Sequence, residues 1–338
     1  MLDFKDHLRA LMAAGSAAEP QAPGLDSIEA YRTSATTWKA VPWGDVTWVE
    51  NSITYSQVVD VYKPAVTIAN APFIVRCHAA SSPYDIEPGS GMDTEIVQKA
   101  SAAGIWVFAL SARHPALSST PTQFFDEDYG RGLQFIRSLA PALGFDASKC
   151  YLFSQSRGSG MLIQNLLPDL ANPTAPTYAG RQSSRGIKMA WSINPQSHNR
   201  SLSAGQKFLI DQTQINLLLN GYPDDARQRN AAELVLTADE SAIPLFVAQY
   251  DAAFQAEKVT LSVLQANGGV THYPNMGLAY RESYVARGLR DRIVVTDLSD
   301  GFSNVAADFV PAIQALEAGL PLAWAVAIAR SARLGHSL

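Results

Sequence analysis

A serine in a strand-to-helix turn is the residue of this sequence best placed to do chemistry. The segment Lys149 to Gly160 has the sequence KCYLFSQSRGSG, in which an apolar strand breaks into Ser-x-Ser-x-Gly and then a helix. A sharp turn of this kind lifts one hydroxyl clear of the sheet and aims the first helical N–H groups at the same space. Ser156 is that hydroxyl, and Ser154 stands where such a turn usually has a glycine. The pattern predicts that Ser156 is a nucleophile.

The elements that must hold this turn are short apolar runs that alternate with helical segments. The runs are APFIVRC (71–77), GIWVFALS (104–111), KCYLFS (149–154), IKMAWSI (187–193), IPLFVAQ (243–249) and RIVVTDL (292–298). Runs of this length are typical of buried parallel strands. Before them, residues 44–50 and 53–62 are rich in β-branched and aromatic residues and predict an antiparallel pair. The fold class predicted is α/β, with a mostly parallel central sheet flanked by helices.

Composition excludes several classes of partner. The chain has 338 residues, 47% of them hydrophobic, and a net charge of -5, which argues against nucleic acid or an anionic membrane as the principal partner. The N-terminal MLDFKDHLRALMAAG predicts an amphipathic helix instead of a secretion signal, and the apolar run at 320–329 is shorter than the ~20 residues that cross a bilayer. We therefore expect a soluble protein without a membrane span, and the sequence leaves its native compartment open. No metal-ligand spacing and no nucleotide-binding glycine motif occurs, so we expect no cofactor.

Four segments, in matching order, resemble the carboxylesterase and lipase families of the α/β-hydrolase superfamily. They are VVDVYKP (58–64), FIVRCHAAS (73–81), ALSARHPAL (109–117) and the stretch from the helix at residue 128 to the turn ending at residue 160. The resemblance spans roughly residues 44 to 318. It implies an α/β-hydrolase fold with a helical cap insertion.

The predicted organisation has three parts. Residues 1–40 form an N-terminal extension, 41–318 form the α/β-hydrolase domain with a cap or lid at about 196–242, and 319–338 form a C-terminal helix. The segment between Pro195 and Pro244 is too long for a simple connection, which is why we assign it to the cap. The apolar face of the C-terminal helix suits packing on the domain or on another subunit, so a homo-oligomer is possible through it.

The resemblance also implies the partners of Ser156. The oxyanion hole would be formed by the backbone N–H of Arg157 and by that of Ala79 or Ala80, two alanines at positions where the families carry glycines. Asp251, just after the strand at 243–249, stands where the families have the acid of the triad. The order serine before aspartate in the chain favours the same role.

The histidine base is left open by the sequence. In the families it follows the last strand, but there the sequence has Asp300 and no histidine. His272 follows Asp251 in the chain and suits the role if VTHYP (270–274) is the eighth strand; if RIVVTDL is that strand, His272 should approach from the wrong edge. His198 and His336 are the alternatives, and His78 is expected to be structural. A chain without a catalytic histidine also stays possible.

These sequence features are compatible with two alternative functions. The first is a serine esterase that cleaves a carboxylic ester, in a small molecule, a glycan or a polymer, through an acyl-enzyme on Ser156. The second is a catalytically inactive α/β-hydrolase-fold module for binding or assembly, which the departures at Ser154, Ala79, Ala80 and Asp300 favour. Fold-level analogy does not identify the substrate.

Overall fold

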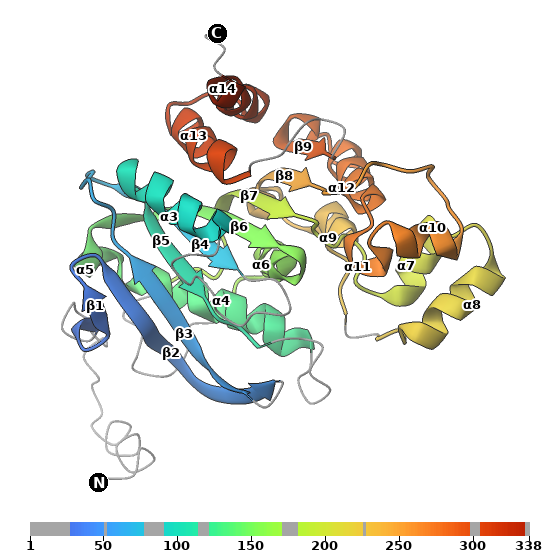
Figure 1. Ribbon diagram of the computed structural model, residues 1–338, viewed down its shortest axis with the longest axis horizontal. Coiled ribbons are helices and arrows are strands. Elements are labelled where there is room, and N and C mark those ends of the chain that lie inside the picture. Colours follow the sequence, from blue (N-terminus) through green and yellow to red (C-terminus); the bar gives the residue numbers. More distant parts are fainter. Residues whose placement is uncertain are drawn as a thin grey trace.

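A sheet flanked by helices on both faces organises the molecule, which we describe from a computed structural model (Figure 1). The structure describes residues 28–50, 53–77, 91–113, 122–170, 182–225, 228–297 and 305–334. The strands are β1 (Arg32–Ser34), β2 (Thr37–Glu50), β3 (Ile53–Tyr62), β4 (Ala71–Cys77), β5 (Trp106–Leu110), β6 (Phe145–Gln155), β7 (Ile187–Ile193), β8 (Leu245–Gln249) and β9 (Ile293–Thr296).

The order of these strands in the 9-stranded sheet is β1-β2-β3-β5-β4-β6-β7-β8-β9. The pairs β1–β2, β2–β3 and β3–β5 are antiparallel, and the pairs from β5 through to β9 are parallel. The predicted opening pair and the mostly parallel sheet are thus confirmed. The sheet begins at Arg32, inside the segment predicted as an extension, because β1 and the start of β2 pair with one another.

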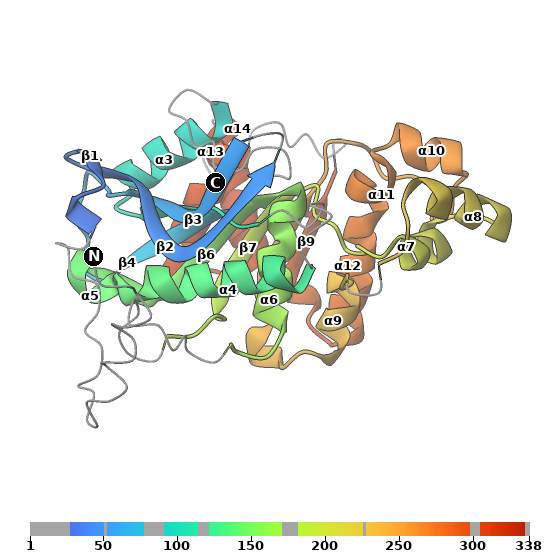
Figure 2. The ribbon, with the colours of Figure 1, turned by 90° about the horizontal axis from the view of Figure 1, so that it is seen from below.

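The helices occupy both faces of the sheet (Figures 1 and 2). They are α3 (Gly91–Ala102), α4 (Thr122–Ser138), α5 (Ala140–Leu143), α6 (Gly160–Leu166), α7 (Ser201–Phe208), α8 (Gln212–Gly221), α9 (Ala231–Thr237), α10 (Leu261–Ala266), α11 (Gly269–His272), α12 (Asn275–Ala286), α13 (Val305–Glu317) and α14 (Leu322–Leu334). Three short 3-10 helices are η1 (Ser156–Ser159), η2 (Glu240–Ala242) and η3 (Arg290–Arg292).

Side-chain alternation in the strands creates one core on each face. In β6, Cys150 and Leu152 belong to the core beneath α4, α6 and α12, whereas Tyr151 and Phe153 belong to the core beneath α3, α13 and α14. This is the two-residue period of a strand, and all four side chains are buried because helices cover both faces. The sheet is therefore packed on both faces, and this packing supports the residues at the ends of its strands.

Helices from two different connections lie together at one end of the molecule. α7 and α8 follow β7, α10 and α11 follow β8, and the four lie side by side away from α3 and α5 (Figures 1 and 2). A parallel bridge between Leu209 and Val259 joins the two connections. The predicted cap segment 196–242 supplies α7, α8 and α9, and its status as a separate cap remains a prediction.

The C-terminal helix uses its apolar face within the chain. Leu322, Ala325, Val326 and Ala329 of α14 are buried in the core that also contains α13. Oligomerisation through this helix stays a prediction. Among the described residues, no helix is both long enough and apolar enough to span a membrane.

Candidate active site

Ser156 sits at the turn between β6 and η1, where the sequence predicts it. Its φ of 52° lies in the left-handed region, which non-glycine residues rarely adopt. A backbone held in this way has the strained strand-to-helix geometry that the sequence pattern predicts for this turn. The residue is only 6% exposed, so the turn presents the hydroxyl at an enclosed position.

Ser154, which replaces the usual glycine of the turn, has a partner of its own. It is fully buried in β6, opposite Ser192 of the neighbouring β7. The two hydroxyls are hydrogen-bonded at 2.6 Å. A serine is accommodated here because its polar atom is satisfied, and the bond ties β6 to β7 two residues before Ser156.

His272 is the histidine that the structure brings to Ser156. The Oγ of Ser156 and the Nε2 of His272 are 2.7 Å apart, a normal hydrogen-bond distance. Nε2 can accept the serine proton when the ring carries its own proton on Nδ1. The pair therefore has the arrangement in which an imidazole can activate a hydroxyl.

The route by which His272 reaches the site differs from the one the sequence suggested. The last strand is β9, in the run 292–298, and residues 269–272 are helix α11, so VTHYP is not a strand. The expectation that His272 would then approach from the wrong edge is wrong. Three α-helices, α10, α11 and α12, and the short η3 separate β8 from β9, and α11 brings His272 to Ser156 at the carboxyl end of β6.

Asp251 lies at the end of β8 but is engaged elsewhere. Its carboxylate accepts a hydrogen bond of 2.8 Å from Nδ2 of Asn194, and its N–H donates to Oδ1 of the same asparagine at 3.1 Å. Asp251 is exposed, and within the described residues it makes no hydrogen bond to His272. No sequence pattern indicated a role for Asn194, which has a φ of 48°, in a region that asparagine tolerates better than most residues.

The predicted oxyanion hole is only partly within the described residues. Arg157 follows Ser156 in η1, where the first N–H groups of a helix have no carbonyl partner within it. Ala79 and Ala80 lie outside the described residues, and so do His78, Asp300 and His336.

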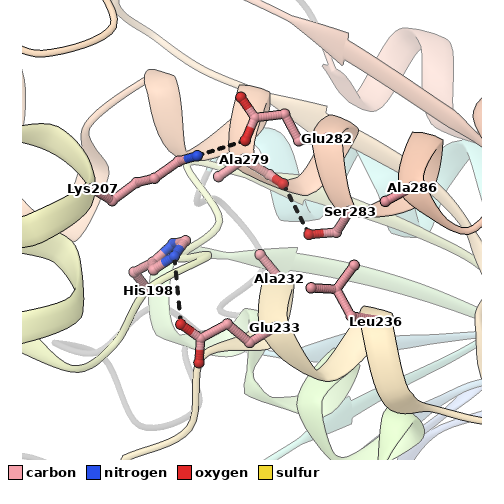
Figure 3. A pocket seen from close by; sticks show the side chains of 9 residues that line it. All are labelled: His198, Lys207, Ala232, Glu233, Leu236, Ala279, Glu282, Ser283 and Ala286. Carbon is pink, nitrogen blue, oxygen red and sulfur yellow. Dashed lines mark hydrogen bonds and ion pairs between the residues drawn. The ribbon is translucent and has the colours of Figure 1, made fainter.

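His198, an alternative base, lies in a different place. It helps line a pocket of about 270 Å³ between α9 and α12, with Lys207 paired to Glu282 at the rim (Figure 3). Its Nδ1 is hydrogen-bonded to Ser197, and its Nε2 faces Glu233 at 4.0 Å. Burial lowers the pKa of His198 to about 4, with the Glu233 carboxylate acting in the opposite direction. His198 is therefore not the partner of Ser156.

A second aspartate, absent from the predicted site residues, directly follows the last strand. Asp297 is 2% exposed, and its Oδ2 accepts a hydrogen bond of 2.6 Å from the N–H of Phe254. Its position was readable from the sequence, since it directly follows the apolar run of β9. The contact of Asp297 with the loop at Phe254 is long-range, and no local sequence pattern indicates it.

Comparisons with known proteins identify the fold. No protein-family model and no curated protein sequence matches the chain. Among solved structures, a bifunctional GH43-CE protein of Bacteroides eggerthii is 13% identical, with 84% of this chain and 38% of that chain covered and a TM-score of 0.50. A truncated carbohydrate esterase from gut microbiota is 12% identical, with 83% and 96% covered and a TM-score of 0.48. The carboxylesterase Cest-2923 of Lactobacillus plantarum is 16% identical, with 75% and 81% covered and a TM-score of 0.46.

These identities show the fold and nothing finer. The strand order, the parallel strands and the helices on both faces of the sheet agree with this fold. The resemblance noted in the four sequence segments is confirmed at this level: the protein has the α/β-hydrolase fold.

Proposed function

We propose that the protein is a serine hydrolase that cleaves a carboxylic ester through an acyl-enzyme on Ser156. The observation that carries the proposal is the 2.7 Å contact between Ser156 Oγ and His272 Nε2, at a turn where Ser156 has a φ of 52°. The strained turn orients the hydroxyl, and the imidazole can remove its proton.

The proposed reaction has two halves. As Ser156 Oγ attacks the ester carbonyl carbon, its proton passes to Nε2 of His272, and the carbonyl oxygen becomes an oxyanion. The Arg157 N–H, with that of Ala79 or Ala80, is the proposed donor to this oxyanion. The tetrahedral intermediate then expels the alcohol, which takes the proton from Nε2, and water repeats the sequence on the acyl-enzyme to release the acid.

The acid that orients His272 stays a prediction. Asp251 is the sequence candidate and stands at the carboxyl end of β8, on the same edge of the sheet as Ser156. Its described hydrogen bonds go to Asn194, so this role rests on its position in the chain.

For the substrate, we propose only a broad class of esters. Two of the similar structures are a carbohydrate esterase and a bifunctional GH43-CE protein, which favours a small-molecule or glycan ester. A homo-oligomer through α14 belongs to the same set of proposals.

Labelling with a fluorophosphonate tests the function directly, because stable adduct formation needs both an activated hydroxyl and an oxyanion hole. We expect one adduct per chain in the wild type, located on Ser156 by peptide mass spectrometry, and none in Ser156→Ala. Hydrolysis of short p-nitrophenyl esters by Ser156→Ala should fall by about 10⁴-fold or more, as loss of a triad member does. Wild-type protein that resists the probe and every ester would instead support the inactive binding or assembly module.

A further inference from the structure

His272 lies on a segment that is too short to hold its own shape. α11 has 4 residues, Gly269–His272, between α10 and α12. An isolated helix of about one turn is not stable in water. Contacts on either side of α11 must therefore help to hold the backbone that carries the His272 ring.

On the amino side, the contact is a close approach that only glycine permits. Gly268 has a φ of 92°, and a Cβ built there would lie 2.7 Å from the Cβ of His272 and 2.9 Å from its carbonyl carbon. The N–H of His272 donates to the carbonyl of Gly268 at 3.0 Å. Gly269 also has a positive φ, of 61°, but a Cβ there would meet nothing within 4 Å.

On the carboxyl side, Asn275 fastens the segment to the loop 253–256. The asparagine is 2% exposed. Its Oδ1 accepts from the N–H of Gln255 at 2.9 Å, and its Nδ2 donates to the carbonyls of Gln255 and Ala256 at 3.2 and 3.1 Å. The hydroxyl of the fully buried Tyr273 donates to the same Ala256 carbonyl at 3.3 Å.

The loop 253–256 is itself fixed by a buried carboxylate. Asp297 accepts from the N–H of Phe254 at 2.6 Å, and Asp297 follows directly on β9, part of the rigid sheet. A path of hydrogen bonds thus runs from the sheet through Asp297, the loop and Asn275 to a point three residues after His272. Asp251, which is exposed and bonded to Asn194, is not on this path.

We propose that Asp297, the loop 253–256 and Asn275 form a positioning platform that, together with Gly268, holds the His272 ring against Ser156. The inference rests on the proposed function, since positioning matters for catalysis only if His272 is the base. Displacement of a catalytic group by about 1 Å costs on the order of 10²-fold in rate, so the platform should be visible in kcat.

Two glycine variants form a matched test. Gly268→Ala and Gly269→Ala both place alanine at a positive φ, but only the first pushes against His272. We expect kcat for a p-nitrophenyl ester to fall about 30- to 100-fold in Gly268→Ala, with KM changed less than threefold, and less than fivefold in Gly269→Ala. Equal losses in the two variants would mean that backbone strain alone is responsible, which would overturn the role of Gly268.

Substitutions in the platform test the other side. Asn275→Ala should lower kcat about 100-fold, and Asp297→Ala should act similarly. Asp297→Asn keeps an acceptor for the Phe254 N–H and should recover most of the activity. An Asp297→Asn variant as poor as Asp297→Ala would show that the charge of Asp297 is required and not only its acceptor for the Phe254 N–H, and this result would contradict the platform.

A readout that does not depend on turnover separates this proposal from the proposed function. When it is introduced into an otherwise wild-type chain, Ser156→Ala should shift the ring resonances of His272 in an NMR spectrum, because the two side chains touch. In an Asn275→Ala or Gly268→Ala background, the same substitution should leave the His272 resonances nearly unmoved. A full shift in both backgrounds overturns the platform. Protein that ignores fluorophosphonate but follows the expected NMR pattern would refute the esterase and retain the platform.

Discussion

The polar residues at the two ends of the central strands differ in what they contact and in how strained their backbone is. At the carboxyl ends, Ser156 and Asn194 have positive φ angles, and Ser156 meets His272, which arrives from another part of the chain. Away from those ends, at the amino end of β7 and at Lys149 and Tyr151 in β6, which we call the amino ends for short, charges are paired within the molecule. Glu317 of α13 accepts hydrogen bonds from Tyr151 and Lys188 and forms an ion pair with Lys149 at 2.8 Å.

This difference separates two uses of the same strands. The amino ends hold a carboxylate paired with two lysines, an arrangement that contributes modestly to stability and contains no reacting group. The carboxyl ends hold strained backbone and a hydroxyl aligned with an imidazole, which suits chemistry at a cost in stability. Substitutions at the carboxyl ends should therefore change activity more than stability, and those at the amino ends should do the reverse.

The largest effect is expected at His272. His272→Asn should lower kcat by ~10³-fold or more, as loss of the general base does in known triads, while the thermal midpoint changes by only a few degrees. In wild type, protonation of the base at low pH should produce an acidic limb in the profile of kcat/KM, and this limb should be missing from the residual activity of the variant. His198→Asn is the matched control, because His198 lies in the pocket between α9 and α12. An equal loss in His198→Asn, or a variant of His272 with wild-type rates, would remove His272 from the mechanism.

The sequence predicted those parts of this site that are encoded locally. The strand, the turn and the helix that present Ser156 lie within twelve consecutive residues, Lys149 to Gly160, so their pattern is visible without any tertiary information. The mostly parallel sheet follows similarly from short apolar runs that alternate with helices. The position of Asp251 just after β8 is also encoded locally, because Asp251 follows a short apolar run.

The sequence could not predict the route of His272. Its place depends on where the β8–β9 connection passes, and that is fixed by hydrogen bonds such as those of Asn275 to residues 255 and 256, twenty and nineteen positions away. The pairing of Ser154 with Ser192 is equally long-range, which is why Ser154 looked like a departure from the turn pattern. Local patterns thus indicate the serine that we propose as nucleophile, and tertiary contacts bring the histidine that we propose as base to it.

A smaller effect, on both activity and stability, is expected beneath the turn. Ser154→Ala leaves the buried hydroxyl of Ser192 without its partner and should lower the free energy of unfolding by ~1–2 kcal/mol. Because Ser154 lies two residues before Ser156, kcat should also fall, by less than about tenfold. Urea unfolding and ester hydrolysis measure the two effects.

A double-mutant cycle shows whether the bond itself is responsible. Ser192→Ala alone should destabilise the protein like Ser154→Ala, and the double variant should lose less than the sum, because neither hydroxyl then remains unpaired. Additive losses would show that the two serines act independently. Ser154→Gly also removes the hydroxyl, so it should lose stability like Ser154→Ala, and its kcat should likewise fall by less than about tenfold.

The smallest effect on activity is expected at the amino ends, where Glu317→Gln should affect stability alone. Burial by itself would raise the pKa of Glu317, but the hydrogen bonds from Lys149, Tyr151 and Lys188 outweigh it and lower the pKa from 4.5 to about 2. The side chain is 19% exposed and the lysines are 28% and 44% exposed, so solvent screening reduces the gain, and we expect a loss of ~1–2 kcal/mol at pH 7.

The pH dependence follows from the direction of this shift. A carboxylate whose pKa is lower in the folded state stabilises the protein above its unfolded pKa of 4.5, and this contribution is lost as the pH falls toward about 2. The difference in unfolding free energy between wild type and Glu317→Gln should therefore be largest at pH 7 and shrink by pH 3, with kcat unchanged at pH 7. Glu240→Gln, at an ion pair whose acid is 61% exposed, is the control and should change stability by less than ~0.5 kcal/mol. A Glu317→Gln variant that lost activity but not stability would break the division between the two ends of the strands, because a charge at the amino ends would then be acting on the chemistry at the other.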